Sequence, residues 1–241
     1  MTKQNIKIIK SSDKIRDAFI SHFKKSFSSI DLIKKNFELD DLHHLLVDEK
    51  NLLQKGTDQS TVFHKAIYST FDQPSFFKSE FWQNYRILSL EIVDKLKNET
   101  CYFGEWAIQR YPTIRFQFPN NVSVFEFHRD SNYLHPIGEI NCFYALNECI
   151  NSSALHIEKN LGFEDYVPLN LKPGEYAILN TSIYKHGDFI NKTRKTRVSM
   201  DFRFIPNIFL SNDVSSLTKK IKLTSDSYFI NEIEMKNFFK D

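Results

Sequence analysis

The apolar residues of this chain change their spacing near residue 100, and that change limits the folds open to it. Before this point they recur every three or four residues, as in Ile15, Phe19, Phe23 and Phe27, which is typical of amphipathic helices. The strongest pattern of this kind is the last one before the change. The spacing predicts helices over 15–27, 28–37, 39–47, 60–71 and 78–97.

From about Cys101 the period becomes two, as in Ile114 to Phe118, which indicates half-buried strands. Turn sequences such as Pro173-Gly174 separate the strand candidates. Helices followed by many short strands predict a mainly β fold, a sandwich or barrel buttressed by the N-terminal helices. The expected strands cover 114–118, 124–128, 139–146, 176–180 and 196–204.

No linker or internal repeat divides the 241 residues, so we expect one domain. In this interpretation 1–100 is a helical support region, 101–206 is the β core, and 207–241 is a C-terminal extension. The extension is polar as far as Tyr228, which predicts a partly mobile tail that ends in a short helix. A hydrophobic content of 41% with 23 Phe can supply a sizeable core.

Charge and cysteine content narrow the classes of function. The formal net charge is +2 and no basic stripe is interleaved with aromatics, so nucleic-acid binding is not expected. No apolar run is long enough for a bilayer, and the N-terminus has no secretory pattern. Cys101, Cys142 and Cys149 are odd in number and lack CxxC spacing, which favours a reducing cytoplasm. The oligomeric state is not readable from this sequence.

The segment from Phe125 to Asp130 contains a histidine and an aspartate that are candidate metal ligands. On a strand, residues two apart project from the same face, so His128 and Asp130 are expected to point inward together. An imidazole and a carboxylate placed in this way offer two neighbouring ligands to a divalent ion. A second histidine from a distant strand would complete the two-His-one-carboxylate triad of iron(II) oxygenases.

His186 is the best candidate for that third ligand, because it follows a Pro-Gly turn and a strand and precedes Gly187. A small residue there is expected to let the backbone bend sharply. Eleven residues beyond His186 comes Arg197, with Ser199 on the same strand face. A guanidinium with a hydroxyl is a natural clamp for a carboxylate. An isolated HxD often marks only a hydrogen-bonded pair, so it is the combination that indicates a metal-dependent barrel.

Other polar residues share strand faces near the expected site, and each is either solvated or lines a pocket. If they line it, the substrate is a polar small molecule. The candidates for substrate binding are Arg115, Gln117, Tyr133 and Glu139. We group Asn141 with Arg197 and Ser199 as a candidate for cosubstrate binding. Asp201 and Arg203 are expected to form a structural ion pair instead.

These motifs together resemble a known family. FHRDSNYLHPIGEIN at 127–141, LKPGEYAILN at 171–180, His186-Gly187 and NKTRKTRVSMDFR at 191–203 are similar to the phytanoyl-CoA-hydroxylase-like branch of the 2-oxoglutarate oxygenases, and most of all to its StrG-type members. The resemblance covers roughly the C-terminal half of the chain. It implies a double-stranded β-helix, a jelly-roll barrel of the cupin kind. It also implies Fe(II) at His128, Asp130 and His186, with 2-oxoglutarate anchored through Arg197.

The resemblance leaves the reaction open. A member of the family would hydroxylate its substrate with O2 and release succinate and CO2, and the carboxylate ligand Asp130 argues against halogenation. Desaturation, ring closure and epimerisation are alternative outcomes at the same iron. A cupin-like metal-dependent isomerase or lyase, or a non-catalytic binding barrel, are alternatives of other classes. The substrate itself is not identified by the sequence.

Overall fold

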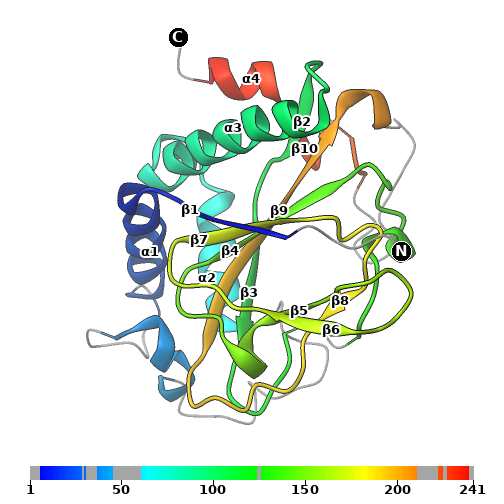
Figure 1. Ribbon diagram of the computed structural model, residues 1–241. Coiled ribbons are helices and arrows are strands. Elements are labelled where there is room, and N and C mark those ends of the chain that lie inside the picture. The colour runs from blue at the N-terminus through cyan, green and yellow to red at the C-terminus, as the bar shows by residue number, and fades with distance from the viewer. Residues whose placement is uncertain are drawn as a thin grey trace.

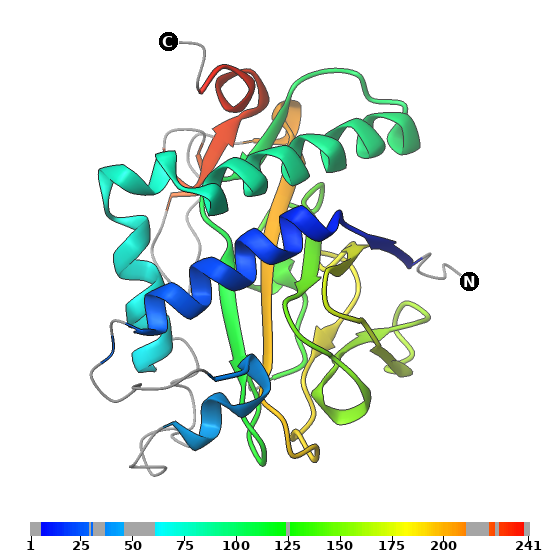
Figure 2. The same cartoon turned by 90° about the vertical axis from the view of Figure 1, so that its left-hand side faces the viewer.

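The computed structural model describes residues 6–28, 30, 37–45, 61–123, 126–210, 222–224 and 227–238. Helices cover one face of a large antiparallel sheet, and a small sheet lies against its other face (Figures 1 and 2). One hydrophobic cluster fills the space between the helices and the large sheet, and a second lies between the two sheets. The chain is therefore layered, and two strands of the large sheet, β4 (Ile140–Ala145) and β7 (Glu175–Leu179), contribute residues to both clusters.

Three of the predicted N-terminal helices, those expected at 15–27, 60–71 and 78–97, are present as α-helices. Ser79 caps α3 by accepting a hydrogen bond from the Trp82 N–H, and Thr61 caps α2 in the same way from His64. The segment expected at 39–47 is instead a short 3-10 helix, and most of the helix expected at 28–37 lies outside the described residues. The helices are α1 (Asp13–Ser28), η1 (Leu39–His44), α2 (Val62–Phe71), η3 (Pro74–Lys78), α3 (Glu80–Thr100) and α4 (Glu232–Asn237).

The large sheet has seven strands in the order β1-β7-β4-β9-β2-β10, and β3 also pairs with β9. The long strand β9 uses one edge twice, because β3 pairs along Arg197–Asp201 and β2 along Phe204–Pro206. The seven strands are β1 (Lys7–Lys10), β2 (Trp106–Gln109), β3 (Thr113–Gln117), β4 (Ile140–Ala145), β7 (Glu175–Leu179), β9 (Arg197–Pro206) and β10 (Phe229–Asn231).

The small sheet has the order β6-β5-β8. Its strands are β5 (Leu155–Glu158), β6 (Tyr166–Leu169) and β8 (His186–Gly187). None of these three was expected from the sequence, and neither were β1, β2 and β10. The pattern failed because they are short or, as in β2 and β5, buried at every position, so they show no alternation.

Strand β9 separates two chemical environments. Val198, Met200, Phe202 and Phe204 are fully buried in the cluster under the helices. The residues between them point to the opposite face because side chains alternate along a strand. This second face carries Arg197, Ser199, Asp201 and Arg203, which are also buried. Strand β9 is thus apolar toward the helices and polar and charged on its opposite face.

The closed barrel implied by the resemblance is not formed by the described residues. They make two separate sheets, and a closed barrel would need a continuous ladder around both. The strand expected at 124–128 would have contributed to that ladder. Val124 and Phe125 lie outside the described residues, and the rest is irregular except for a single bridge from His128 to His186. The mainly β architecture with supporting helices agrees with the prediction.

The C-terminal segment is more than a tail. The expected short helix is present as α4, but β10 just before it pairs with β2 at the edge of the large sheet. The Tyr228 hydroxyl also accepts a hydrogen bond of 2.9 Å from Arg203 Nη1. Among the described helices, none is long and apolar enough to cross a membrane.

Burial of His22 in α1 predicts a pH-dependent stability. Its ring lies 4.8 Å from that of Phe81 and its Nε2 bonds to the Thr70 hydroxyl. Burial, helped by Lys25, lowers the pKa of His22 from 6.5 to about 4. A folded-state pKa below the unfolded value gives stability that is present above pH 6.5 and is lost as the pH falls toward 4.

We expect His22→Gln, which cannot be protonated, to have a free energy of unfolding that depends less on pH. The slope should decrease by up to about 1.4 kcal/mol per pH unit. Urea unfolding between pH 4 and 7, at about half-unit steps, measures the free energy of unfolding. The exposed His44, changed to Gln, is the matched control and should keep the wild-type profile. Parallel profiles for wild type and His22→Gln would contradict the prediction.

Candidate metal centre

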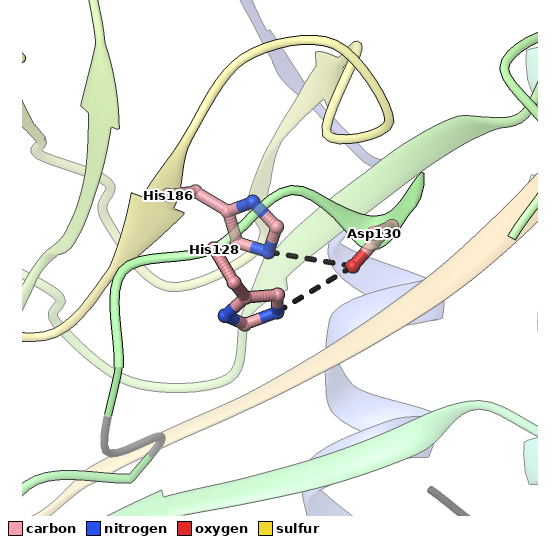
Figure 3. A group of neighbouring side chains, drawn as sticks. All are labelled: His128, Asp130 and His186. Atoms are coloured by element: carbon pink, nitrogen blue, oxygen red, sulfur yellow. Dashed lines mark ion pairs between the residues drawn. The ribbon is translucent and has the colours of Figure 1, made fainter. Parts of the chain in front are cut away.

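His128, Asp130 and His186 come together between the two sheets. Each offers one ligand atom, and these atoms lie within 4.8 Å of one another (Figure 3). The two histidines sit opposite each other on antiparallel backbones that exchange both N–H···O bonds, at 3.0 and 2.9 Å. Paired residues of this kind project on the same side of the backbone. The bridge therefore presents both imidazoles to one point.

The reason expected for Asp130 pointing inward was wrong, although its position was right. It was placed on a regular strand, two residues after His128, but it begins a 3-10 helix, η4 (Asp130–Tyr133). Its backbone N–H donates to the carbonyl of Thr181 at 2.9 Å, and this contact fixes where η4 begins. A turn, and not strand alternation, directs the carboxylate toward the histidines.

The two oxygens of Asp130 have different partners. Oδ1 lies 3.6 Å from His128 Nε2 and 3.7 Å from His186 Nε2 (Figure 3). Oδ2 accepts a hydrogen bond of 2.7 Å from the Thr181 hydroxyl and one of 3.2 Å from Arg203 Nη2. Burial alone would raise the pKa of Asp130, but Arg203 and the two histidines hold it well below its usual range. The carboxylate is thus ionised, with one oxygen anchored and the other turned to the histidines.

Both imidazoles are in a form that can bind a metal. The Nδ1 of His128 donates to the carbonyl of Glu126 at 2.7 Å, so Nε2 is the nitrogen that is turned toward Asp130. Burial lowers the pKa of His186 to about 4, which keeps that ring neutral at pH 7. Two imidazole nitrogens and one carboxylate within reach of one another are a donor set for a divalent metal such as iron(II).

Gly187 has a different role from the one expected. It was predicted to allow a sharp bend, but it lies in β8. A Cβ there would meet the backbone Cα of Phe127 at 3.1 Å and its ring at 3.0 Å. The glycine therefore allows the Phe127–His128 backbone to approach β8 closely enough for the two histidines to pair.

A pocket opens beside the three ligands, and the polar face of β9 forms much of its wall. Of the residues proposed for cosubstrate or substrate binding, Arg197, Asn141 and Arg115 line it. Ser199 lies on the same strand face and is fully buried. Within the described part of the chain, neither Ser199 Oγ nor Asn141 Oδ1 has a hydrogen-bond partner. Arg197 Nε also has no partner among the described residues, so Asn141 and Arg197 each bring one unpartnered polar atom to the pocket wall.

The three arginines of the pocket each face a carboxylate. Arg115 Nε lies 3.1 Å from Asp201, and Arg203 Nε lies 2.8 Å from Glu139 as well as bonding to Asp130. Arg197 forms a bidentate pair with Asp188, at 2.7 and 3.1 Å. The pocket therefore holds fixed charges of both signs.

The remaining substrate candidates lie away from the pocket lining. Gln117 donates a hydrogen bond of 2.7 Å to the carbonyl of Phe189, and Glu139 is buried between Arg203 and His135. Tyr133 packs the edge of its ring on His128, with centroids 5.1 Å apart. These three residues support neighbouring groups in the structure, and nothing places them against a ligand.

Three residues of the site were missed by sequence reasoning. Arg203 was predicted to form a structural ion pair with Asp201, and this pair is present at 3.6 Å, but the bond from Arg203 to the carboxylate ligand was not expected. Its place two and four residues beyond Asp201 and Ser199 on one strand face was the available signal. Thr181 and Asp188 had no such signal. They lie in irregular chain just before and after β8, where side-chain direction does not follow a period.

Known proteins share sequence or fold with this chain. No family model matches the chain. It is 28% identical over 200 residues to the streptomycin biosynthesis protein StrG of Streptomyces griseus, covering 83% of this chain and 90% of that protein. The solved carbocyclase SnoK of nogalamycin biosynthesis, a non-haem alpha-ketoglutarate-dependent enzyme, shares the fold at 11% identity. Its TM-score is 0.51, over 84% of this chain and 80% of SnoK.

A nickel complex of the non-haem monooxygenase ThoJ matches over 87% of this chain and 78% of its own, at 10% identity and a TM-score of 0.48. Similarity to StrG and SnoK extends into the helical N-terminal region, beyond the half of the chain that carries the motifs. The phytanoyl-CoA-hydroxylase-like branch remains a prediction.

The contact between Thr181 and Asp130 predicts that Thr181→Val weakens metal binding. The substitution keeps the side-chain shape but removes the hydroxyl that fixes Oδ2. Loss of a group that orients a metal ligand typically lowers metal affinity by about 10- to 100-fold. Calorimetric titration with Mn(II) or anaerobic Fe(II) measures the change.

Ser182→Ala is the control for Thr181→Val. Ser182 is adjacent and equally buried, but its hydroxyl bonds to the Pro136 and Glu139 carbonyls and not to Asp130. It should change metal affinity by less than about twofold, a difference of about 0.4 kcal/mol. Equal metal affinity in Thr181→Val and wild type would mean that Arg203 alone orients Asp130.

Proposed function

We propose that this protein is an Fe(II)- and 2-oxoglutarate-dependent oxygenase that acts on a polar small molecule. The observation that supports it most is the placement of His128, Asp130 and His186 within 4.8 Å of one another at the wall of a pocket. Two histidines and one carboxylate on one side of an iron leave three coordination positions for ligands. When bound there, ferrous iron with 2-oxoglutarate supplies the oxidising chemistry, in which O2 is consumed and succinate and CO2 are released.

The chain's own residues have distinct tasks in this proposal. His128, Asp130 and His186 hold the metal, while Thr181 and Arg203 keep Asp130 oriented. Arg197 is the proposed anchor for the distal carboxylate of 2-oxoglutarate, and Ser199 and Asn141 offer unpartnered polar atoms beside it. Arg115 lines the pocket next to Asp201, so this part of the wall suits a substrate with amine, hydroxyl or carboxylate groups.

The names of the similar proteins support this class without fixing the reaction. StrG is described as a streptomycin biosynthesis protein, and SnoK as an alpha-ketoglutarate-dependent carbocyclase. We infer a role in the biosynthesis of a small molecule, with hydroxylation as the proposed outcome. An isomerase or lyase that uses a divalent metal alone is the second candidate, and it would show no dependence on 2-oxoglutarate.

The proposal predicts metal-dependent binding of 2-oxoglutarate. Under anaerobic conditions the apo-protein should take up one Fe(II) per chain, because it has one such group of ligands in the described residues. Addition of 2-oxoglutarate should then give the visible charge-transfer absorption of its iron chelate. His128→Ala and His186→Ala should lose both signals.

His156→Ala is the matched control for this experiment. His156 lies in β5 directly opposite Gly187, but its Nδ1 bonds to the Ala154 carbonyl and it is not one of the clustered ligands. This variant should keep the iron and the absorption band. Iron binding without any response to 2-oxoglutarate would favour the isomerase or lyase, and wild-type iron affinity in both ligand variants would reject the metal site.

The carboxylate ligand predicts the type of product. Asp130 fills the position, and supplies the negative charge, that a halide would need at the iron. With a substrate found by screening polar small molecules, the product should gain one oxygen or lose two hydrogens, as read by mass spectrometry. Asp130→Gly should abolish that activity. A chlorinated product from the wild-type enzyme in chloride buffer would contradict this prediction.

A further inference from the structure

The guanidinium of Arg197 is nearly saturated by the protein itself. Of its five N–H donors, the two on Nη1 reach Asp188 Oδ1 at 2.7 Å and the Ser153 carbonyl at 3.1 Å. The two on Nη2 reach Asp188 Oδ2 at 3.1 Å and the Ser123 hydroxyl. Within the described part of the chain only Nε has no acceptor.

The pair between Arg197 and Asp188 is closed off from water. Their side chains are 1% and 0% exposed. Asp188 Oδ1 and Oδ2 each accept a hydrogen bond from one terminal nitrogen of Arg197, which is the geometry of a bidentate guanidinium–carboxylate ion pair. The charge of the proposed anchor is therefore balanced by a protein carboxylate before any ligand arrives.

Asp188 holds the bidentate face of Arg197, the face that a ligand carboxylate would use. A carboxylate that met the guanidinium in this state would find the Nε donor alone, close to the negative charge of Asp188. Asp188 is not tied into a ladder, because it directly follows the last residue of β8. The next two residues, Phe189 and Ile190, are 48% and 54% exposed, although Gln117 bonds to the Phe189 carbonyl.

We propose that Asp188 is a specificity-determining residue that competes with the distal carboxylate of the cosubstrate for Arg197, and so weakens the binding of dicarboxylic 2-oxo acids. The inference rests on the proposed function. Asp188 leaves Arg197 when 2-oxoglutarate binds. The free energy needed to break the ion pair between Asp188 and Arg197 therefore lowers the affinity for 2-oxoglutarate. The opposite role, a fixed partner that orients Arg197 for the ligand, predicts the opposite sign when Asp188 is neutralised.

The test compares two 2-oxo acids in the metal-loaded full chain, wild type and Asp188→Asn. Asn keeps the shape of the side chain and removes its charge. Anaerobic Fe(II) protein is titrated with 2-oxoglutarate and with 2-oxobutyrate, which has the same chelating end but no distal carboxylate. We expect the 2-oxoglutarate dissociation constant to fall about tenfold, equivalent to about 1.4 kcal/mol. The 2-oxobutyrate constant should change by less than about twofold, so the ratio of the two constants is the readout.

Asp201→Asn is the matched control, since it neutralises the partner of another pocket arginine, Arg115. It should leave that ratio unchanged. The inference is overturned if Asp188→Asn binds 2-oxoglutarate equally or more weakly, if both acids tighten alike, or if Asp201→Asn gives the same gain. In each of these cases, binding of 2-oxoglutarate by the Fe(II)-loaded wild-type protein would still support the proposed function. If neither wild type nor Asp188→Asn binds 2-oxoglutarate in the presence of iron, the inference and the proposed function both fail.

A second measurement needs no variant, because an unpaired buried arginine can prevent Asp188→Asn from folding. In a crystal structure of the wild-type protein with Mn(II) and 2-oxoglutarate, the Asp188 carboxylate should have left Arg197, with the distal carboxylate in its place. Retention of the bidentate pair between Asp188 and Arg197 in that complex would overturn the inference.

Discussion

The two faces of strand β9 are the constraint on which the rest of the structure depends. One face is fully apolar and buried under the helices, whereas the other carries two arginines, an aspartate and a serine that are also buried. A buried charge is strongly unfavourable unless it is paired. The chain must therefore bring carboxylates to Arg197 and Arg203 from elsewhere, and it does so with Asp188, Asp130 and Glu139. The small sheet and η4 are held in place partly by these contacts.

The metal centre follows from the same requirement. Arg203 pairs with Asp130 and so fixes a carboxylate beside the inner face of the large sheet. The bridge between His128 and His186 then sets two imidazoles against that carboxylate. Ionisation of Asp130 in a buried place depends on Arg203 and the histidines, since burial by itself acts in the other direction. The placement of the three candidate metal ligands and the pairing of the buried charges are thus one arrangement.

The sequence was informative where periodicity is strong. The helices α1, α2 and α3 and the strands β3, β4, β7 and β9 follow from apolar spacing, as does the polar face that carries Arg197 and Ser199. The three ligand candidates are brought together as expected, although Asp130 reaches its place through a 3-10 turn. Apolar spacing cannot reveal a strand of two to four residues or a contact made by an irregular segment, because neither shows a periodic pattern. For this reason β8, Thr181 and Asp188 were not predicted. The single-domain interpretation stays a prediction.

The bond from Arg203 to the Tyr228 hydroxyl has a consequence for biosynthesis of the protein itself. Ribosomes deliver a chain from its N-terminus, so His128, Asp130, His186 and Arg203 emerge before Tyr228 and β10. Strand β2, made much earlier, has to wait for β10 to cover its free edge. Arg203, which holds the Asp130 carboxylate, therefore acquires its full set of partners only after the rest of the pocket has been synthesised.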